Sequence, residues 1–157
     1  MTTAPVISFR KVSEPYGWLG NMSAYTVRYE GKSYRTAEAL FQALRFNDEE
    51  IRKEIWLQSS PMIAKHKAKK HASKMVTQPK SNKDIENMRL VVELKCEQHP
   101  DLRRFLLATG DAHLVEDTTA RTDRFWGAAL IDGALVGENV LGTIWMNLRE
   151  KLRNENH

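Results

Sequence analysis

Glu38 and Gln42 stand four residues apart in residues 34–46, a stretch whose residue types could hold a polar ligand. The segment predicts a helix that begins after Thr36, because the threonine hydroxyl can accept a backbone N–H of the first turn. Glu38 would lie in that turn, where the helix dipole favours a carboxylate, and Gln42 one turn further along the same flank. The alternative is a capping glutamate and a solvent-exposed glutamine, and the frequency of glutamate in first helical turns favours this alternative.

Lys95 is a second candidate, because it lies in the longest predicted helix, residues 82–98. It falls three residues after Val92, at the edge of an apolar stripe that also includes Ile85, Met88 and Cys96. Burial of an ammonium disfavours its charged form and lowers its pKa, which makes the lysine a better nucleophile. The alternative is that the stem packs while the ammonium reaches water, and the spacing alone favours this alternative.

Acidic and aromatic residues lie on predicted loops. Two acids flank a polar loop that ends in a Trp-Gly pair, and a further tryptophan lies on an earlier, glycine-containing turn. These residues are Trp18, Glu116, Asp123, Trp126 and Gly127. Aromatic side chains on loops either cover the core or stack on a ligand. Asn139 begins the final predicted helix, residues 139–153, whose N-terminal amide groups could receive an anion.

Motifs of several catalytic and phosphate-binding mechanisms are missing from the sequence. It contains no GxxxxGK[ST], G-x-G-x-x-G, HExxH, Cys-x-x-Cys or G-x-S-x-G pattern. The five histidines are scattered, and the lone Cys96 excludes an intrachain disulfide and a multi-cysteine zinc site. We therefore expect neither a metal nor a cofactor. The remaining carboxylates, lysine and loop aromatics suit cleavage of a glycosidic bond, whose transition state resembles an oxocarbenium ion.

The length of 157 residues predicts a single domain over residues 1–157, and 41% hydrophobic residues suit a soluble protein. The formal charge of +4 favours an anionic partner, either a phosphorylated metabolite or nucleic acid. The lysines and histidines of residues 65–74 form either a solvated face or a phosphate-attracting rim. Because there is no signal-peptide pattern and no apolar run approaching ~20 residues, we expect a cytoplasmic protein. The single cysteine fits a reducing compartment.

The pattern predicts an α+β fold, predominantly α-helical, with an N-terminal β-hairpin and small strands. Strands are predicted over residues 6–9, 25–29 and 32–34, the last two joined by a Glu30-Gly31 turn, and residues 114–117 are extended. Helices are predicted over residues 36–46, 61–71, 82–98, 100–110 and 139–153, with a further helix capped by Asn47.

Seven short motifs follow one another along nearly the whole chain. They are Tyr16-Gly17-Trp18-Leu19-Gly20-Asn21; Tyr34-x-Thr36-x-Glu38-x-x-Phe41-Gln42-Ala43-x-x-Phe46; Ser59-Ser60-Pro61-Met62-x-Ala64; Met88-x-x-Val91-x-x-x-Lys95-x-x-Gln98; Leu107-x-Thr109-Gly110-x-x-x-Leu114-Val115-Glu116; Asp123-x-x-Trp126-Gly127; and Gly137-x-Asn139-x-Leu141-Gly142-x-x-x-Met146-x-x-Arg149. In this order they resemble the motifs of the NADAR superfamily, the YbiA-like N-glycosidases.

The resemblance implies a compact, mostly helical fold and N-glycosidase activity on phosphoribosylated or ADP-ribosylated bases. Members of this type act on early riboflavin-pathway intermediates, cleaving the ribosyl–amine bond to release ribose 5-phosphate. Others are held to remove ADP-ribose from guanine in nucleic acid. Three departures from the family pattern bear on substrate choice: Ala39 where relatives often carry histidine, Ala128-Ala129 in place of Asp-Gly, and a longer loop at residues 116–123.

The residues and the resemblance together predict the members of an active site. The catalytic candidates are Glu38, Lys95, Asp123 and Glu116. The substrate-binding candidates are Trp18, Asn21, Gln42, Trp126, Gly127 and Asn139. Either a carboxylate stabilises positive charge and directs water at the sugar C1′, or Lys95 attacks the sugar and forms a Schiff base. Both routes require the acids and Lys95 to converge around one anomeric carbon.

The alternative from another functional class is a module that binds ADP-ribose or nucleic acid without cleaving it. The positive charge, the basic run at residues 65–74 and Ala128-Ala129 favour it, although no other nucleic-acid motif is found. The expected partner is thus a phosphorylated N-ribosyl small molecule or an ADP-ribosylated base, with nucleic acid as the alternative and no membrane.

Overall fold

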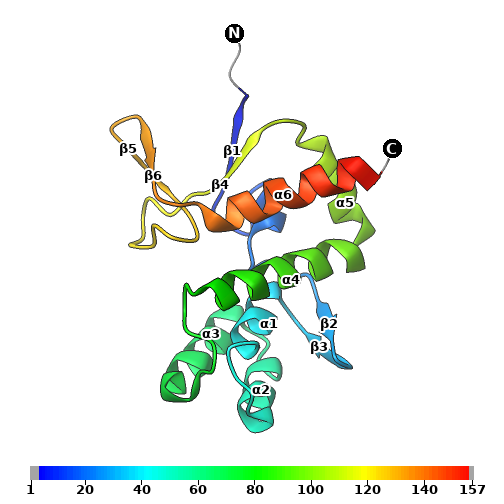
Figure 1. Ribbon diagram of the computed structural model, residues 1–157, viewed down its shortest axis with the longest axis vertical. Helices are drawn as coiled ribbons and strands as arrows, with labels where there is room; N and C mark the ends of the chain where they lie inside the picture. Colours follow the sequence, from blue (N-terminus) through cyan, green and yellow to red (C-terminus); the bar gives the residue numbers. More distant parts are fainter. Residues whose placement is uncertain (1–3, 156–157) are drawn as a thin grey trace. The chain divides into compact units, whose positions relative to one another are not determined.

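Helices predominate in the protein, and its strands are short (Figure 1). The structure, a computed structural model, describes residues 4–155, which contain six α-helices and six strands. The predicted α+β, mostly helical class is therefore confirmed. Residues 21–99 form one compact unit, and residues 4–20 together with 100–155 form another. Within the described residues, no helix combines the length and the apolar character that crossing a membrane requires.

The unit of residues 21–99 contains a hairpin and four helices. Its elements are β2 (Val27–Tyr29), β3 (Lys32–Tyr34), α1 (Ala37–Ala43), α2 (Glu49–Trp56), α3 (Pro61–Lys70), the 3-10 turn η2 (Ala72–Lys74) and α4 (Asn82–Gln98). The hairpin is the predicted one. Glu30 and Gly31 form its turn with φ values of 49° and 77°, as a two-residue type I′ connection requires.

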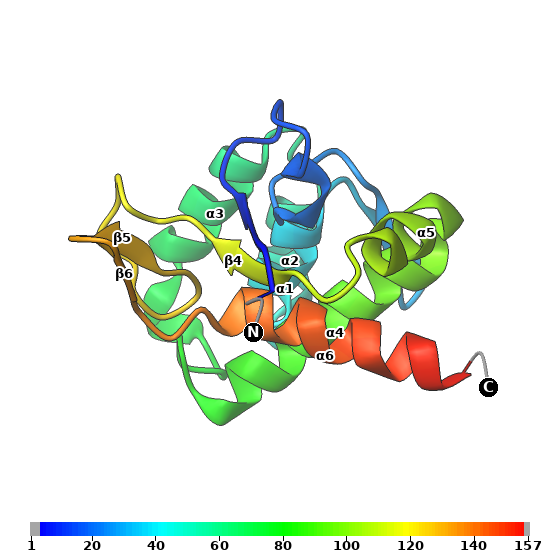
Figure 2. The same cartoon turned by 90° about the horizontal axis from the view of Figure 1, so that it is seen from above.

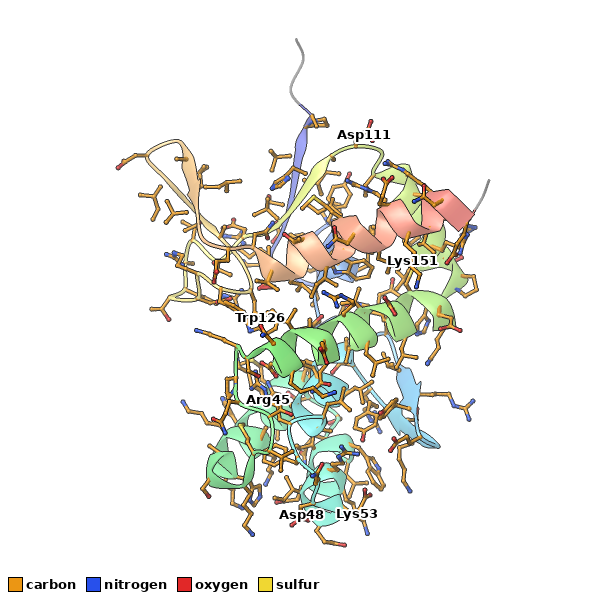
Figure 3. The ribbon with its side chains drawn as sticks, in the orientation of Figure 1. Arg45, Asp48, Lys53, Asp111, Trp126 and Lys151 are labelled. Atoms are coloured by element: carbon orange, nitrogen blue, oxygen red, sulfur yellow. The ribbon has the colours of Figure 1, made fainter. Side chains whose placement is uncertain are left out.

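Helix caps in this unit follow the sequence signals, with one correction. The Thr36 hydroxyl accepts the Ala39 N–H at 3.2 Å, as predicted for the start of α1. The cap of α2 is Asp48 and not Asn47, because the Asp48 carboxylate accepts the N–H groups of Glu50 at 2.9 Å and of Ile51 at 3.2 Å (Figure 3). Asn47 lies one residue outside the helix cap and contributes no cap.

Helix α4 is the longest helix within residues 4–155 and has the bounds predicted for it. Ser81 caps it by accepting the Asp84 N–H at 3.2 Å. The buried side of α4 packs against α1 and β2, while α1 also packs against α2 and α3. The two charged residues of this unit that have no exposed surface, Asp84 and Lys95, both lie on α4.

The other unit contains a parallel strand pair, a second hairpin and two helices. Its elements are β1 (Val6–Phe9), the 3-10 turn η1 (Gly17–Leu19), α5 (Pro100–Ala108), β4 (His113–Glu116), β5 (Ala129–Ile131), β6 (Ala134–Val136) and α6 (Val140–Glu155). Strands β1 and β4 lie side by side in parallel, with Phe9 opposite Glu116 (Figures 1 and 2). Helix α6 packs closely on β4, since a Cβ at Gly142 would lie 2.1 Å from the Leu114 carbonyl oxygen.

The β5–β6 hairpin was not predicted. Its turn is formed by Asp132 and Gly133, with φ values of 50° and 79°, and the Asp-Gly pair is a usable hairpin signal that the sequence reading passed over. In both views the hairpin extends away from the β1–β4 pair (Figures 1 and 2). Leu130 and Leu135, which pair across it, are both exposed.

Candidate active site

One face of α4 carries three residues that bind polar side chains from residues 21–45. Asp84, Met88 and Lys95 are spaced by four and seven residues, which places them on the same side of a helix. Each of the three forms a hydrogen bond with a residue outside α4. This face of α4 therefore organises the polar groups of the unit.

Lys95 is completely buried, with no exposed surface. Its Nζ donates to the Ser23 hydroxyl oxygen at 2.9 Å and lies 5.3 Å from the centroid of the Tyr25 ring. Burial lowers the pKa of the Lys95 ammonium from 10.5 to about 7. The alternative in which the ammonium reaches water is wrong, and about half of the lysine is the neutral amine at pH 7.

Glu38 and Gln42 form a buried pair on α1. Gln42 Nε2 donates to Glu38 Oε1 at 2.9 Å, and the two residues are 4% and 8% exposed, respectively. The alternative of a solvent-exposed glutamine is therefore wrong. The Glu38 backbone N–H also donates to the Asn21 carbonyl oxygen at 3.0 Å, which ties Asn21 to the first turn of α1.

Arg45 and Asp84 extend this pair into a buried chain of polar groups, and the sequence reading missed both. Arg45 Nη1 donates to Gln42 Oε1 at 3.3 Å, so the glutamine carboxamide must turn its NH₂ toward Glu38. The guanidinium binds Asp84 in a bidentate manner, Nε to Oδ1 at 2.9 Å and Nη2 to Oδ2 at 2.8 Å. The spacing of residues 38, 42 and 45 along one helix flank was the available signal for Arg45.

Asn21 lies between α1 and α4. Its Nδ2 donates to the Met88 sulfur at 3.1 Å, and the residue is 8% exposed. Among residues 4–155, no hydrogen bond is made to its Oδ1. Asn21, Glu38, Gln42 and Lys95 thus belong to one compact unit, in which α1 packs against α4.

Asp123 shapes the loop that carries Trp126. Its Oδ1 accepts the backbone N–H groups of Phe125 at 2.9 Å and of Trp126 at 3.1 Å, and its carbonyl oxygen accepts the Thr118 hydroxyl at 2.6 Å. The Trp126 ring meets the Phe125 ring edge-on at 4.8 Å. Asp123 therefore holds the backbone of the half-buried Trp126 in place.

Gly127 brings the same loop close to the end of β4. A Cβ at this position would lie 2.6 Å from the Glu116 carbonyl oxygen and 2.4 Å from the Thr118 methyl carbon. The Glu116 carboxylate itself pairs with Arg121 at 3.6 Å. The absence of a side chain at residue 127 is thus required for packing, a reason that the motif alone does not reveal.

Asn139 is buried, and its side-chain amide forms two hydrogen bonds with the backbone of β4, as the backbone of a neighbouring strand would. Its Nδ2 donates to the Leu114 carbonyl at 2.8 Å, and its Oδ1 accepts the Glu116 N–H at 3.0 Å. The backbone N–H groups of residues 139–141 donate to the carbonyls of residues 125–127. The groups that the predicted anion site would use therefore already have partners, and an anion would have to displace these carbonyls.

Trp18 lies in an aromatic cluster. Its ring centroid is 5.7 Å from that of Phe105 and 5.8 Å from that of Trp145, whose Nε1 donates to the Leu19 carbonyl at 2.9 Å. Six of the predicted residues belong to this second unit, namely Trp18, Glu116, Asp123, Trp126, Gly127 and Asn139. Their convergence with Glu38 and Lys95 around one sugar stays a prediction. In the described part of the chain, no three acidic, histidine or cysteine side chains are grouped as metal ligands would be.

Comparisons with known proteins place this chain among glycosidases by similarity. It is 39% identical to N-glycosidase YbiA of Escherichia coli over 150 residues, which cover 96% of this chain and 90% of that protein. It is 32% identical over 151 residues to N-glycosidase Npun_R5314 of Nostoc punctiforme, covering 94% of this chain and 93% of that protein. A third similarity, 29% over 147 residues, covers 94% of this chain but 38% of the Vibrio vulnificus riboflavin biosynthesis protein VVA0006.

The fold agrees with these similarities. The solved NMR structure of Escherichia coli YbiA superposes with a TM-score of 0.84 at 37% identity, covering 99% of this chain and 89% of that one. The family model of the NADAR domain matches residues 8–153, a range that includes all six helices of the described chain but for the last two residues of α6. The chain therefore belongs to the NADAR domain family.

Proposed function

We propose that this protein is an N-glycosidase that hydrolyses the ribosyl–amine bond of phosphoribosylated riboflavin-pathway intermediates and releases ribose 5-phosphate. The names of the Escherichia coli and Nostoc relatives support the reaction class, and the name of the Vibrio relative supports the pathway. The observation that carries the proposal is Lys95, an amine that is fully buried, donates to the Ser23 hydroxyl at 2.9 Å and has its pKa lowered by burial to about 7. An ordinary lysine would be neutral in fewer than about one molecule in a thousand.

Lys95 acts as the nucleophile. Its neutral Nζ attacks C1′ and forms a C–N bond while the bond from C1′ to the substrate amine breaks, and the proton that Nζ loses after the attack is transferred to the departing amine. Opening of the ribose ring then gives an iminium between the sugar and Lys95. Water adds to the iminium carbon, the C–N bond to Lys95 breaks, and ribose 5-phosphate leaves as the aldehyde with the lysine restored.

Glu38 stabilises the positive charge that develops at C1′. Gln42 holds one carboxylate oxygen of Glu38 at 2.9 Å, and Arg45 fixes the direction of that carboxamide. A charged group that is held in place before the reaction needs no reorganisation in the transition state. Gln42 thus contributes by orienting Glu38.

The remaining candidates belong to the second unit. We propose that they contact the substrate or stabilise its developing charge. Asp123 and Glu116 are the further carboxylates, and Trp126 and Trp18 are the surfaces on which the leaving base stacks. Gly127 and Asn139 contribute by holding the Trp126 loop and β4 in place. We do not assign the substrate phosphate to the N-terminus of α6, because its amides bind the loop carbonyls of residues 125–127.

The test is incubation with a ribosylaminopyrimidine phosphate and assay of free ribose 5-phosphate. Glu38→Gln should lower kcat/KM by about 10²–10³, the usual cost of losing one electrostatic stabiliser. Glu86→Gln is the matched control, since Glu86 is an exposed glutamate of α4 in the same unit, and it should retain full activity. Unchanged turnover by Glu38→Gln would remove the role of Glu38, and no release by the unmodified protein would reject the substrate class.

A second candidate function is removal of ADP-ribose from guanine in nucleic acid. It is favoured by the exposed lysines at the end of α3 and in η2, namely Lys65, Lys69, Lys70 and Lys74. If a polyanion binds there, the rate of ADP-ribose release should fall steeply as the salt concentration rises. Each phosphate that a lysine neutralises makes the binding affinity more dependent on salt. Assay of ADP-ribose release from an ADP-ribosylated oligonucleotide over a range of salt concentrations decides between the two substrates.

A further inference from the structure

Asn21 holds its side-chain amide in one orientation. The group facing Met88 is Nδ2, 3.1 Å from the thioether sulfur. A thioether sulfur accepts hydrogen bonds and cannot donate them, so the amide nitrogen and not the oxygen must face it. Oδ1 is therefore directed away from the sulfur, and rotation of the amide would bring two acceptors together.

Oδ1 of Asn21 is an acceptor without a donor. Among the buried side-chain nitrogen and oxygen atoms of residues 4–155, it is the one that has no hydrogen-bond partner. Buried polar atoms of native proteins are almost always paired with protein, ordered water or a ligand, so an acceptor that the protein leaves open is a place where a donor from a ligand can bind. Asn139 is the contrasting case in this chain, because both atoms of its buried amide are bound by β4.

Asn21 is anchored through both its backbone and its side chain, with its backbone next to that of Glu38. The Asn21 carbonyl oxygen accepts the Glu38 N–H at 3.0 Å, and the side chain is held from α4 through Met88. The backbone and the side chain of Asn21 are thus anchored on two different helices. Such a group keeps its geometry when a ligand arrives, so the acceptor is preorganised.

We propose that Asn21 Oδ1 accepts a hydrogen bond from a ribose hydroxyl of the bound substrate, at C2′ or C3′. The inference depends on the proposed function, because it takes the sugar to be placed with C1′ at Glu38. An acceptor needs a donor, which excludes a phosphate oxygen as its partner. The C2′ hydroxyl is the donor nearest to C1′ on the sugar, and the C3′ hydroxyl is the next. Asn21 then selects ribosyl over deoxyribosyl substrates.

The test is a set of binding measurements that needs no turnover. Ribose 5-phosphate, 2-deoxyribose 5-phosphate and 3-deoxyribose 5-phosphate are titrated calorimetrically into the full chain. The unmodified protein should bind ribose 5-phosphate about tenfold more tightly than one of the two deoxy sugars, the usual effect of one hydrogen bond. The sugar that loses affinity identifies the hydroxyl.

A variant of Asn21 assigns that preference to the amide oxygen. Asn21→Ala should abolish the preference, so that the affected pair of sugars binds equally. The control is Gln98→Ala in the same unit, because both atoms of the Gln98 amide are bound by the Arg28 backbone, at 2.7 and 2.8 Å. This variant should keep the preference of the unmodified protein.

Three results would overturn the proposal. The first is that none of the sugars binds, and the second is that the unmodified protein binds all three with equal affinity. The third is that Asn21→Ala lowers the affinity for all three sugars by the same factor, so that the preference persists without the amide. The first two need no variant, so the proposal stays open to refutation if Asn21→Ala does not fold. Failure of the proposed function would be detected separately, because the cleavage assay would then show no release of ribose 5-phosphate. A protein that releases ribose 5-phosphate but ignores both hydroxyls refutes only the role of Asn21.

Discussion

Lys95 is the residue in which local environment changes chemistry most. It has no exposed surface, and its ammonium has the Ser23 hydroxyl at 2.9 Å and the Tyr25 ring beneath it. A hydroxyl and an aromatic face compensate only partly for lost hydration, so the neutral amine is favoured. Burial thereby lowers the pKa of Lys95 into the range that the proposed nucleophile needs at neutral pH.

The pH dependence of activity follows from this lowered pKa. Lysine attacks only as the neutral amine, and the fraction that is neutral rises with pH until it passes the pKa of about 7. We expect kcat/KM to rise about tenfold per pH unit below pH 6 and to level off above pH 8. Measurement of kcat/KM from pH 5 to pH 10, with circular dichroism at each pH as the control for folding, checks this. A rate that continues to rise up to pH 10 would indicate an ordinary lysine.

The burial of individual residues was only partly predictable from the sequence. The Glu38–Gln42 pair follows from helical spacing, but the general frequency of first-turn glutamate favoured an exposed glutamine. The depth of Lys95 depends on Ser23, which lies 72 residues earlier, and no helical pattern contains that information. The same holds for Asp84, whose partner Arg45 is 39 residues away.

Among the elements, α4 is joined by a buried ion pair to Arg45, which lies just beyond the C-terminal end of α1. Asp84 has no exposed surface, and the Arg45 side chain is 10% exposed. Removal of one member of such a pair leaves an uncompensated charge in a medium that solvates it poorly. We expect Asp84→Asn to lower the free energy of unfolding by about 3–5 kcal/mol, measured by urea denaturation.

The matched control is Lys83→Ala, the neighbouring residue of α4. Lys83 and Glu86 form a pair whose side chains are 66% and 62% exposed, and exposed pairs contribute about 0–1 kcal/mol. The control should therefore unfold close to the unmodified protein. Equal stability of the Asp84 variant and this control would show that the ion pair does not hold the two helices together.

Gly127 determines how the Trp126 loop meets β4. An alanine Cβ would lie 2.6 Å from the Glu116 carbonyl oxygen, and a backbone atom cannot yield without moving the strand. We expect Gly127→Ala to lower the thermal midpoint by several degrees, as overpacking costs about 1–3 kcal/mol. Gly20→Ala is the comparison, because its nearest contact is 3.3 Å. A midpoint unchanged by Gly127→Ala would mean that the loop shifts at no cost.

The elements themselves were more predictable than their pairing. Helix α4 has the bounds predicted for it, since Ser81 and the long apolar stripe mark them in the sequence. The pairing of β1 with β4 was not predictable, because the two strands lie more than a hundred residues apart and each is four residues long. The cap of α2 shows that the exact end of a helix is harder to predict than the helix itself, because Asp48 and not Asn47 accepts the first backbone N–H groups.

At the scale of the whole molecule, the order of motifs carried more information than any single element. The NADAR model matches residues 8–153, which span both compact units, and the Escherichia coli YbiA structure agrees over 99% of the chain. Composition and periodicity alone predicted a mostly helical α+β protein with an anionic partner. They could not identify the reaction, because the candidate residues lie far apart along the chain and only tertiary packing gives each its environment.

Trapping of the sugar on Lys95 tests the proposed lysine nucleophile directly. Borohydride reduces an iminium to a stable amine, so treatment during turnover of a ribosylaminopyrimidine phosphate should leave the sugar phosphate covalently attached. Peptide mass spectrometry should locate it on Lys95, with no adduct in Lys95→Ala and a normal adduct in Lys83→Ala. Release of ribose 5-phosphate with no trapped adduct, or an adduct that persists in Lys95→Ala, would contradict a buried lysine as the nucleophile.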